Sequence, residues 1–320
     1  MLTYTLRRLI QSIPIMLGIS LLIFTIVQLA PGSPVDRFRT PNIRPEQLEN
    51  IMRLYGLDRP VWEQYVSWLG AFFSFPFNQE AWGYSFTTNL PVRDYIFERI
   101  PATVTLMGTA LIVTIIVSVP IGIIAAVKQY SWADKIISGF ATIGYAMPSF
   151  LLGLYVLYFG GVVLKAFPLF GRQSLGKDGD ILDIAWHLVL PVTSLAIQSI
   201  AGYSRYLRAS MLDVLRQDYV RTAKAKGLAE SRVVLKHALR NALIPFITLI
   251  GLSLPSLVAG AVITEGIFSY PGLGQLTITA ISQNDYPTIY ATGMLTGFFV
   301  IMGNLVADIL YGVVDPRIKY

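Results

Sequence analysis

The chain has 320 residues, of which 54% are hydrophobic and only 14% are charged, and its mean hydropathy is +0.57. These values lie far from those of soluble domains, so the composition excludes an ordinary water-soluble protein and indicates a polytopic membrane protein. No cysteine occurs, which excludes disulfides, iron–sulfur clusters and thiolate metal sites in this chain.

Six apolar stretches are long enough to cross a membrane. A hydrocarbon layer about 30 Å thick needs roughly 20 apolar residues in helical form. Continuous apolar runs favour helices over barrel strands, which are about 10 residues long and alternate in character. The predicted fold class is therefore an all-α membrane protein with six transmembrane helices. The expected spans are 9–30, 104–127, 136–159, 184–203, 242–263 and 291–311.

A long segment, 31–100, separates the first two spans and divides the chain into 1–100 and a five-helix core, 101–320. Within it, Pro60 follows Asp58 as a first helical position, and aromatic and apolar residues then recur at helical spacing. This pattern predicts an interfacial helix. Its aromatic residues form either a belt at headgroup depth, which the sequence favours, or a docking surface for an external partner. The residues are Trp62, Tyr65, Val66, Leu69, Phe72 and Phe73.

Basic residues in the short loops and at the ends of the chain predict the orientation, because Lys and Arg accumulate on the cytoplasmic side. One side has fifteen and the other has three. Both termini and the loop 205–240 are therefore expected in the cytoplasm, and 31–100 outside. The net charge of +6 reflects this asymmetry and attraction to anionic membrane lipid, with no need for nucleic acid. The fifteen are Arg7, Arg8, Lys128, Lys135, nine within 205–240, Arg317 and Lys319; the three are Lys165, Arg172 and Lys177.

Catalytic signals are weak. The two histidines, His187 and His237, are expected near opposite membrane faces, so they cannot form a zinc helix or a Ser-His-Asp set. The string Gly171-Arg-Gln-Ser-Leu-Gly-Lys177 resembles a phosphate-binding P-loop, but Asp178 stands where Ser or Thr would bind Mg²⁺. We therefore expect no nucleotide site there.

The spans also lack the buried charges of an ion-coupled carrier. The second, third and fifth spans have no charged residue in their interiors. Asp308, in the sixth span beside Asn304, is explained by snorkelling or by a bond between helices. The energy source is therefore expected on another polypeptide, while a stand-alone channel and a membrane-embedded enzyme are the alternatives.

The loop 205–240 is the richest in basic residues. The fourth span is expected to continue as a helix to Arg216, and a short helix from Asp218 to be closed by Gly227 in a left-handed conformation. A second short helix, 230–242, would then precede Pro245. Helix, glycine turn and helix make a compact knob, which either only fixes the topology or docks on a partner.

Two strings in this loop match a known pattern. Thr222-Ala-Lys-Ala-Lys-Gly227 followed by Lys236-His-Ala-Leu-Arg-Asn-Ala-Leu-Ile-Pro245 resembles the EAA loop in permease subunits of bacterial ABC importers. Thr222 and Lys224 stand where that loop has Glu and its second Ala. The chain looks most like the B-type permease of oligopeptide and dipeptide importers, within the peptide/nickel branch. Further matching segments are Leu29-Ala-Pro-Gly32, Tyr55-Gly-Leu-Asp58, Asp218-Tyr-Val-Arg221, Phe268-Ser-Tyr-Pro-Gly-Leu-Gly274, Asp285-Tyr-Pro287 and Asp315-Pro-Arg317.

The resemblance implies a multi-pass subunit in the cytoplasmic membrane of a prokaryote, without enzyme activity or a cofactor of its own. Its implied partners are a second homologous permease, two cytoplasmic ATPase subunits that hold ATP and Mg²⁺, and an external substrate-binding protein. The knob would be a coupling helix in a groove of the ATPase, where small Ala223 and Gly227 permit close approach and arginines pair with acidic groups. The expected coupling residues are Asp218, Arg221, Thr222, Ala223, Lys224, Gly227, Arg232, Val233, His237 and Arg240.

The segment 265–287 is aromatic, rich in glycine and free of Lys and Arg. It is expected to return toward the pore or to receive the binding protein. Pro245, Pro255, Gly251 and Gly260 suit the fifth span to bending and close packing near the path, although ordinary bundle packing explains the glycines equally well. The expected path or gate residues are Pro255, Glu265, Tyr270 and Gly272. Peptides, nickel complexes and oligosaccharides all remain open as substrates.

Overall fold

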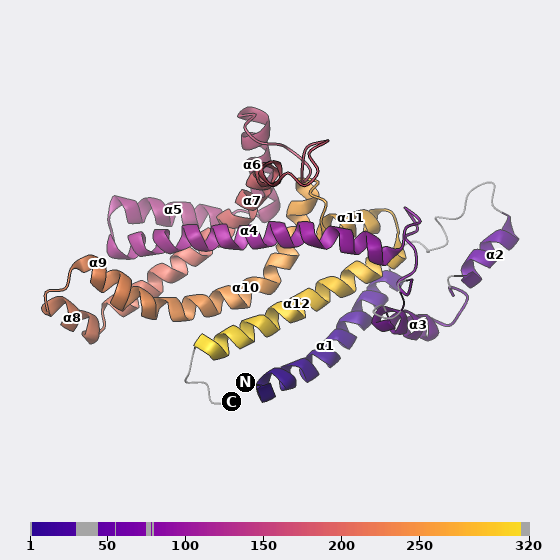
Figure 1. Cartoon of the computed structure of the whole chain (residues 1–320), viewed down its shortest axis with the longest axis horizontal. Coiled ribbons are helices and arrows are strands. Elements are labelled where there is room, and N and C mark those ends of the chain that lie inside the picture. Colours follow the sequence, from indigo (N-terminus) through magenta and orange to yellow (C-terminus); the bar gives the residue numbers. More distant parts are fainter. Residues whose placement is uncertain (1, 30–43, 55, 75–77, 79, 315–320) are drawn as a thin grey trace.

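The computed structural model describes residues 2–29, 44–54, 56–74, 78 and 80–314, and it describes the backbone alone at 2–5, 45, 51, 54, 252–260 and 309–314. The matching segments at 29–32 and 315–317, and Tyr55, lie partly or wholly outside these residues. The long helices form a bundle (Figure 1). Helices α2 (Pro45–Leu54) and α3 (Val61–Ser74) lie toward one end of it, and α8 (Asp218–Ala225) and α9 (Glu230–Arg232) lie at the other. The bundle helices are α1 (Leu2–Leu29), α4 (Val92–Val127), α5 (Trp132–Ala146), α6 (Ser149–Leu157), α7 (Ile181–Leu215), α10 (Leu239–Ile267), α11 (Leu273–Ser282) and α12 (Tyr286–Val314).

The predicted all-α membrane fold is confirmed. In the described part of the chain, five helices are long and apolar enough to cross a membrane, and there are six candidate spans when a bent pair of helices is counted as one. Several helices run beyond the predicted apolar windows, because the helical conformation continues into the flanking polar residues, as at 92–103 in α4. In particular, α7 runs to Leu215 and its C-cap is Arg216, as predicted for the fourth span.

The third span differs from the prediction of one helix over 136–159. Helix α5 and the helical segment Ser149–Val163, which includes α6 and the π-helical turn η2 (Tyr158–Val163), meet at 109°. Met147 is extended, with φ −80° and ψ 130°, and Pro148 follows it. A proline ring disfavours the helical conformation of the residue before it. The Met147 carbonyl accepts a bond from Gln198 of α7 at 3.2 Å, so the break leaves this carbonyl paired.

Glycines allow α12 to approach its neighbours. A Cβ at Gly297 would lie 2.9 Å from Ile19 of α1, and one at Gly251 of α10 would lie 3.3 Å from Ala307 of α12. Small residues at such contacts let helix backbones pack closely in membranes. The structure therefore assigns Gly251 to bundle packing. Pro255 and Gly260 lie in the part of α10 whose side chains are outside the described residues.

The charged residue of the sixth span binds another helix. Asp308 of α12 lies 3.3 Å from Arg8 of α1. This pair confirms the predicted interhelical contact and places the start of α1 beside the end of α12, as Figure 1 shows.

A second ion pair joins α5 to α7. Arg208 donates from Nε and Nη2 to the two oxygens of Asp134, both at 2.7 Å. Asp134 is buried and also accepts from the backbone N–H of Tyr130 at 2.9 Å. Arg208, one of the nine basic residues of the loop, therefore serves packing within the chain.

The segment predicted to form an interfacial helix is helical, as α3 (Val61–Ser74), preceded by α2 (Pro45–Leu54), and its place at the interface stays a prediction. Its aromatic side chains divide into two faces. Tyr65 lies edge-on to Phe24 of α1 with centroids 5.3 Å apart, and Phe72 stacks on Trp82 at 5.2 Å. Trp62 and Phe73, by contrast, are exposed. One face of α3 therefore anchors it to the bundle, and the other is exposed, as either predicted role of this helix requires.

Candidate functional site

The knob consists of α8 (Asp218–Ala225), the turn at Gly227, α9 (Glu230–Arg232) and the π-helical turn η3 (Val233–Ala238). Its interior is formed by Val220, Ala223 and Val233, which are buried against one another. A buried interior of this size gives the short helices a defined packing that isolated helices of eight residues would not have in water.

Gly227 closes α8 as predicted. Its φ is +75°. Its N–H donates to the Lys224 carbonyl at 3.0 Å, and the N–H of Lys226 donates to the Thr222 carbonyl at 3.1 Å. A Cβ at this position would meet nothing within 4 Å. Backbone conformation, and not space within this chain, therefore demands glycine here.

Most predicted coupling residues lie on the outer surface of the knob. The side chains of Asp218 and Arg221 are 95% and 73% exposed and lie 3.5 Å apart. Thr222 donates its hydroxyl to the Asp218 carbonyl at 2.9 Å, so this residue bonds locally where the EAA-loop pattern that it resembles has glutamate. The exposed set is Asp218, Arg221, Thr222, Lys224, Gly227, Arg232 and Arg240; His237 is half-buried, while Ala223 and Val233 point into the knob.

The second helix of the knob differs from the prediction. No separate helix over 230–242 forms, because α9 and η3 lead directly into α10, and Pro245 lies inside α10 instead of beginning a new helix. A π-helical turn widens the helix by one residue and often marks a functional position. The knob is therefore continuous with the fifth span.

At the other end of α10, Glu265 is fully buried at a junction of three helices. Its carboxylate accepts from the Thr103 hydroxyl of α4 at 2.6 Å, from the N–H of Gly274 at 2.6 Å and from the N–H of Gln275 at 3.1 Å. The N–H of Leu273 bonds to the Thr103 oxygen at 2.8 Å. These N–H groups belong to the first turn of α11, which has no partners within its own helix. Glu265 therefore caps α11 and complements its dipole.

Two glycines permit this contact. A Cβ at Gly272 would overlap the Glu265 carboxylate, and a Cβ at Gly274 would overlap the backbone of Val262. The predicted gate residues Glu265 and Gly272 therefore belong to one packed unit. We call Thr103, Glu265 and 272–275 the α11 junction.

Tyr270, the third predicted gate residue, is also fully buried, and its N–H bonds to the Glu265 carbonyl at 2.9 Å. Its ring packs in a core with Leu106 and Phe268. Burial raises the pKa of its hydroxyl to about 12, and the charge of Arg172 opposes this shift. Tyr270 therefore holds the loop before α11 in place.

In the sequence, Asp285 stands out only as part of the matching segment Asp285-Tyr-Pro287. In the structure its carboxylate accepts several hydrogen bonds. It is buried and accepts from Ser85 at 2.5 Å, from the N–H of Phe86 at 3.0 Å and from Thr288 at 2.9 Å. Its place before α12 signals a helix cap in the sequence. Its partners Ser85 and Phe86, in the segment before α4, lie about two hundred residues away along the chain, and no sequence signal links them to Asp285.

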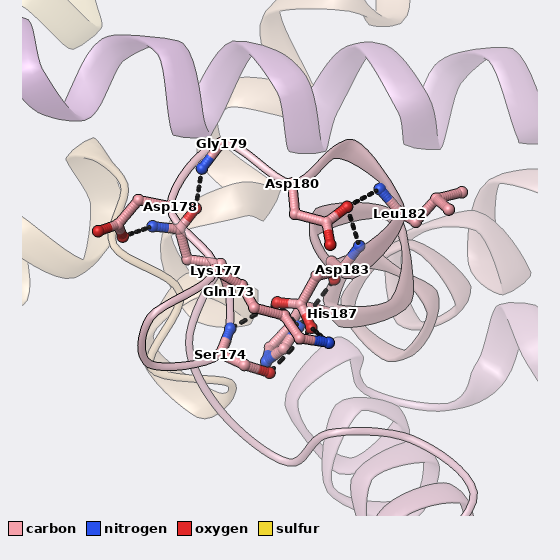
Figure 2. Close-up of polar contacts among 9 residues, drawn as sticks. All are labelled: Gln173, Ser174, Lys177, Asp178, Gly179, Asp180, Leu182, Asp183 and His187. Atoms are coloured by element: carbon pink, nitrogen blue, oxygen red, sulfur yellow. Dashed lines mark hydrogen bonds and ion pairs between the residues drawn. The ribbon is translucent and has the colours of Figure 1, made fainter.

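The P-loop-like string closes the start of α7, as Figure 2 shows. Ser174 donates its N–H and hydroxyl to Asp183 at 2.5 and 2.9 Å, and Lys177 lies 3.4 Å from the same carboxylate. Asp180 accepts from the N–H of Leu182 at 2.9 Å. The polar groups that resembled a phosphate site are thus engaged in capping.

Comparison with known proteins identifies the family. Residues 118–320 match the binding-protein-dependent transport system inner membrane component, and 1–107 match the N-terminal part of the membrane component of such systems. The oligopeptide transport system permease protein AppB of Bacillus subtilis (strain 168) is 42% identical over 320 residues, covering 100% of each chain. The dipeptide transport system permease protein DppB of Escherichia coli (strain K12) is 38% identical over 342 residues, covering 100% of this chain and 99% of the relative.

A solved structure of the MetNI methionine ABC transporter, in an inward-facing conformation, is similar in fold. The TM-score is 0.58 and the identity 15%, over 70% of this chain and 98% of that chain. At this identity the likeness supports the fold alone. Together with the full-length sequence matches, it shows that the chain belongs to the family of inner membrane components of binding-protein-dependent transport systems.

Proposed function

We propose that the chain is the permease subunit of an ABC importer that moves oligopeptides or dipeptides across the cytoplasmic membrane by alternating access. The observation that carries this proposal is the similarity over the whole length to permeases named for oligopeptide and dipeptide transport. The exposed, basic and internally packed knob supports it, because such a surface suits a soluble partner with an acidic groove.

The proposed assembly contains this chain, a second homologous permease, two ATPase subunits that bind ATP and Mg²⁺, and an external substrate-binding protein. In the proposed orientation the knob and both ends of the chain face the cytoplasm, following the distribution of Lys and Arg. The α11 junction then lies toward the outer side.

The fold provides a mechanical connection between these two regions. Tyr219 of α8 accepts a bond from Asn241 at 2.8 Å, and Ser210 of α7 donates to the Ala242 carbonyl at 3.1 Å. Helix α10 runs for 29 residues, about 44 Å, and carries Glu265 near its far end. A displacement of the knob by the ATPases would therefore be passed along α10 to the α11 junction.

The test is uptake of a labelled dipeptide and a labelled oligopeptide into liposomes that contain the assembled complex. We expect uptake only with ATP and the binding protein present, and competition by unlabelled peptide. Nickel complexes or oligosaccharides that compete better than peptides would contradict the substrate class. Passage of solute through the chain alone, without ATP, would instead support a stand-alone channel.

A further inference from the structure

An apolar groove of about 550 Å³ runs between α1, α3, α4 and α12, a volume typical of small-molecule sites. Ile13 on α1, Phe97 on α4 and Phe298 on α12 line it and are 60%, 43% and 43% exposed, so the groove is open. Met16 and Trp82 are buried and form its floor. Because α1 and α12 are long and apolar enough to span a membrane, the part of the groove that they line is expected at hydrocarbon depth, and Phe72 and Phe73 of α3 extend the groove beyond it.

The walls of the groove do not suit another helix. Close helix packing in membranes uses glycine, alanine, serine and threonine, as at Gly297 against Ile19 in this structure. Among the described residues that line the groove, only Ser12 is small, and its hydroxyl bonds to the Arg8 carbonyl at 2.8 Å. Leucine, isoleucine, methionine and phenylalanine make up most of the remaining wall. Such a surface suits a flexible hydrocarbon chain that can follow its irregular shape.

A cation lies beside the groove. Arg93, one turn before Phe97 on the same face of α4, holds its guanidinium 5.5 Å from the centre of that ring. Its Nε is buried without a hydrogen-bond partner among the described residues. Its Nη1 lies 3.7 Å from a carboxylate oxygen of Asp94, a weak ion pair with an exposed partner. An arginine with unused donors is suited to bidentate binding of a phosphate.

We propose that this groove binds one acyl chain of an anionic phospholipid, whose phosphate contacts Arg93. The lipid would fill the space between α1 and the bundle, at a place where α1 packs on α12 through glycines on a neighbouring face. A bound lipid there would fix the position of α1 relative to α4, and it would rest on Met16 and Trp82, which pack in one hydrophobic cluster with Leu273 of the α11 junction.

The test measures lipid binding to the full-length chain in detergent by native mass spectrometry, with phosphatidylglycerol and phosphatidylcholine as probes. We expect Arg93→Gln to weaken phosphatidylglycerol binding about tenfold and to leave phosphatidylcholine unchanged, as loss of a charge-assisted contact predicts. Arg59→Gln, which removes an exposed charge away from the groove, is the matched control.

A second variant separates the acyl chain from the headgroup. Ser12→Phe fills the groove and should reduce binding of both lipids, whereas Leu22→Trp, on an exposed part of α1 outside the groove, should change neither. Glycerophosphoglycerol, which has no acyl chain, should fail to compete at equal concentration. Unchanged binding in both Arg93→Gln and Ser12→Phe would overturn the proposal, as would protein adducts in place of lipid adducts from a photoreactive residue at Ile13.

Discussion

The knob and the α11 junction both contain dense motifs, but their residues are held in different ways. In the knob, three small apolar side chains pack together and most of the motif residues face outward. In the α11 junction, the motif residues are buried, and each oxygen of Glu265 accepts a bond from a neighbouring segment. A motif on an exposed surface indicates contact with a partner, whereas a buried motif indicates a packing requirement within the chain.

The largest effect is expected at the α11 junction, from Gly274→Val. The added side chain would overlap the backbone of Val262, which cannot move aside as a flexible side chain can. We expect a loss of about 3 kcal/mol in stability, the upper part of the range for overpacking. The melting temperature of the purified chain measures it. Gly108→Val is the control, because a Cβ at Gly108 meets nothing within 4 Å; equal melting temperatures in the two variants would contradict the close approach.

Glu265→Ala is expected to have the next largest effect. The change leaves the N–H groups of Gly274 and Gln275 and the hydroxyl of Thr103 without their acceptor. A buried donor left unpaired costs about 1–3 kcal/mol. Glu265→Gln keeps an acceptor oxygen and should cost less. If alanine and glutamine gave the same melting temperature and the same peptide uptake, the capping role would be wrong.

In the knob, Gly227→Val should separate coupling from folding. A β-branched residue at φ +75° costs on the order of 2 kcal/mol locally and would deform the turn, while the spans remain inserted. We expect a loss of ATPase stimulation and uptake with little change in membrane insertion. Asparagine tolerates the left-handed conformation, so Gly227→Asn should retain most activity. Normal activity in the valine variant would count against the coupling role of the knob.

The sequence predicted what local pattern determines. Hydropathy located the membrane spans, and a glycine after a short helix located the turn at Gly227. It missed the bend at Pro148, because the apolar run is continuous there and other prolines, such as Pro120, remain inside a helix. Packing of α5 and α6 on α7 decides whether the chain bends at Pro148 or continues as one helix.

Contacts between distant segments were beyond the sequence. Glu265 was singled out by its place in a segment rich in aromatic residues and glycine, but its partner Thr103 lies 162 residues away on another helix. Ala223 was expected to approach a partner subunit, yet it packs inside the knob against Val233. A single sequence shows which residues are small, whereas the fold decides which surface they face.

The smallest effect is expected from Thr222→Glu, which restores the residue typical of the family loop. Thr222 is exposed and its side chain bonds only to the Asp218 carbonyl among the described residues, so its replacement should change stability by less than about 0.5 kcal/mol. The new carboxylate would gain Lys226 as a neighbour four residues on and face Asp218 four residues back, and these contributions oppose each other. With its own ATPase subunits the variant should retain wild-type stimulation, measured as phosphate release. If the stimulation fell as far as in Gly227→Val, the threonine itself would fit the partner groove. The outer surface of the knob would then be packed across the subunit interface as specifically as the α11 junction is packed within the chain.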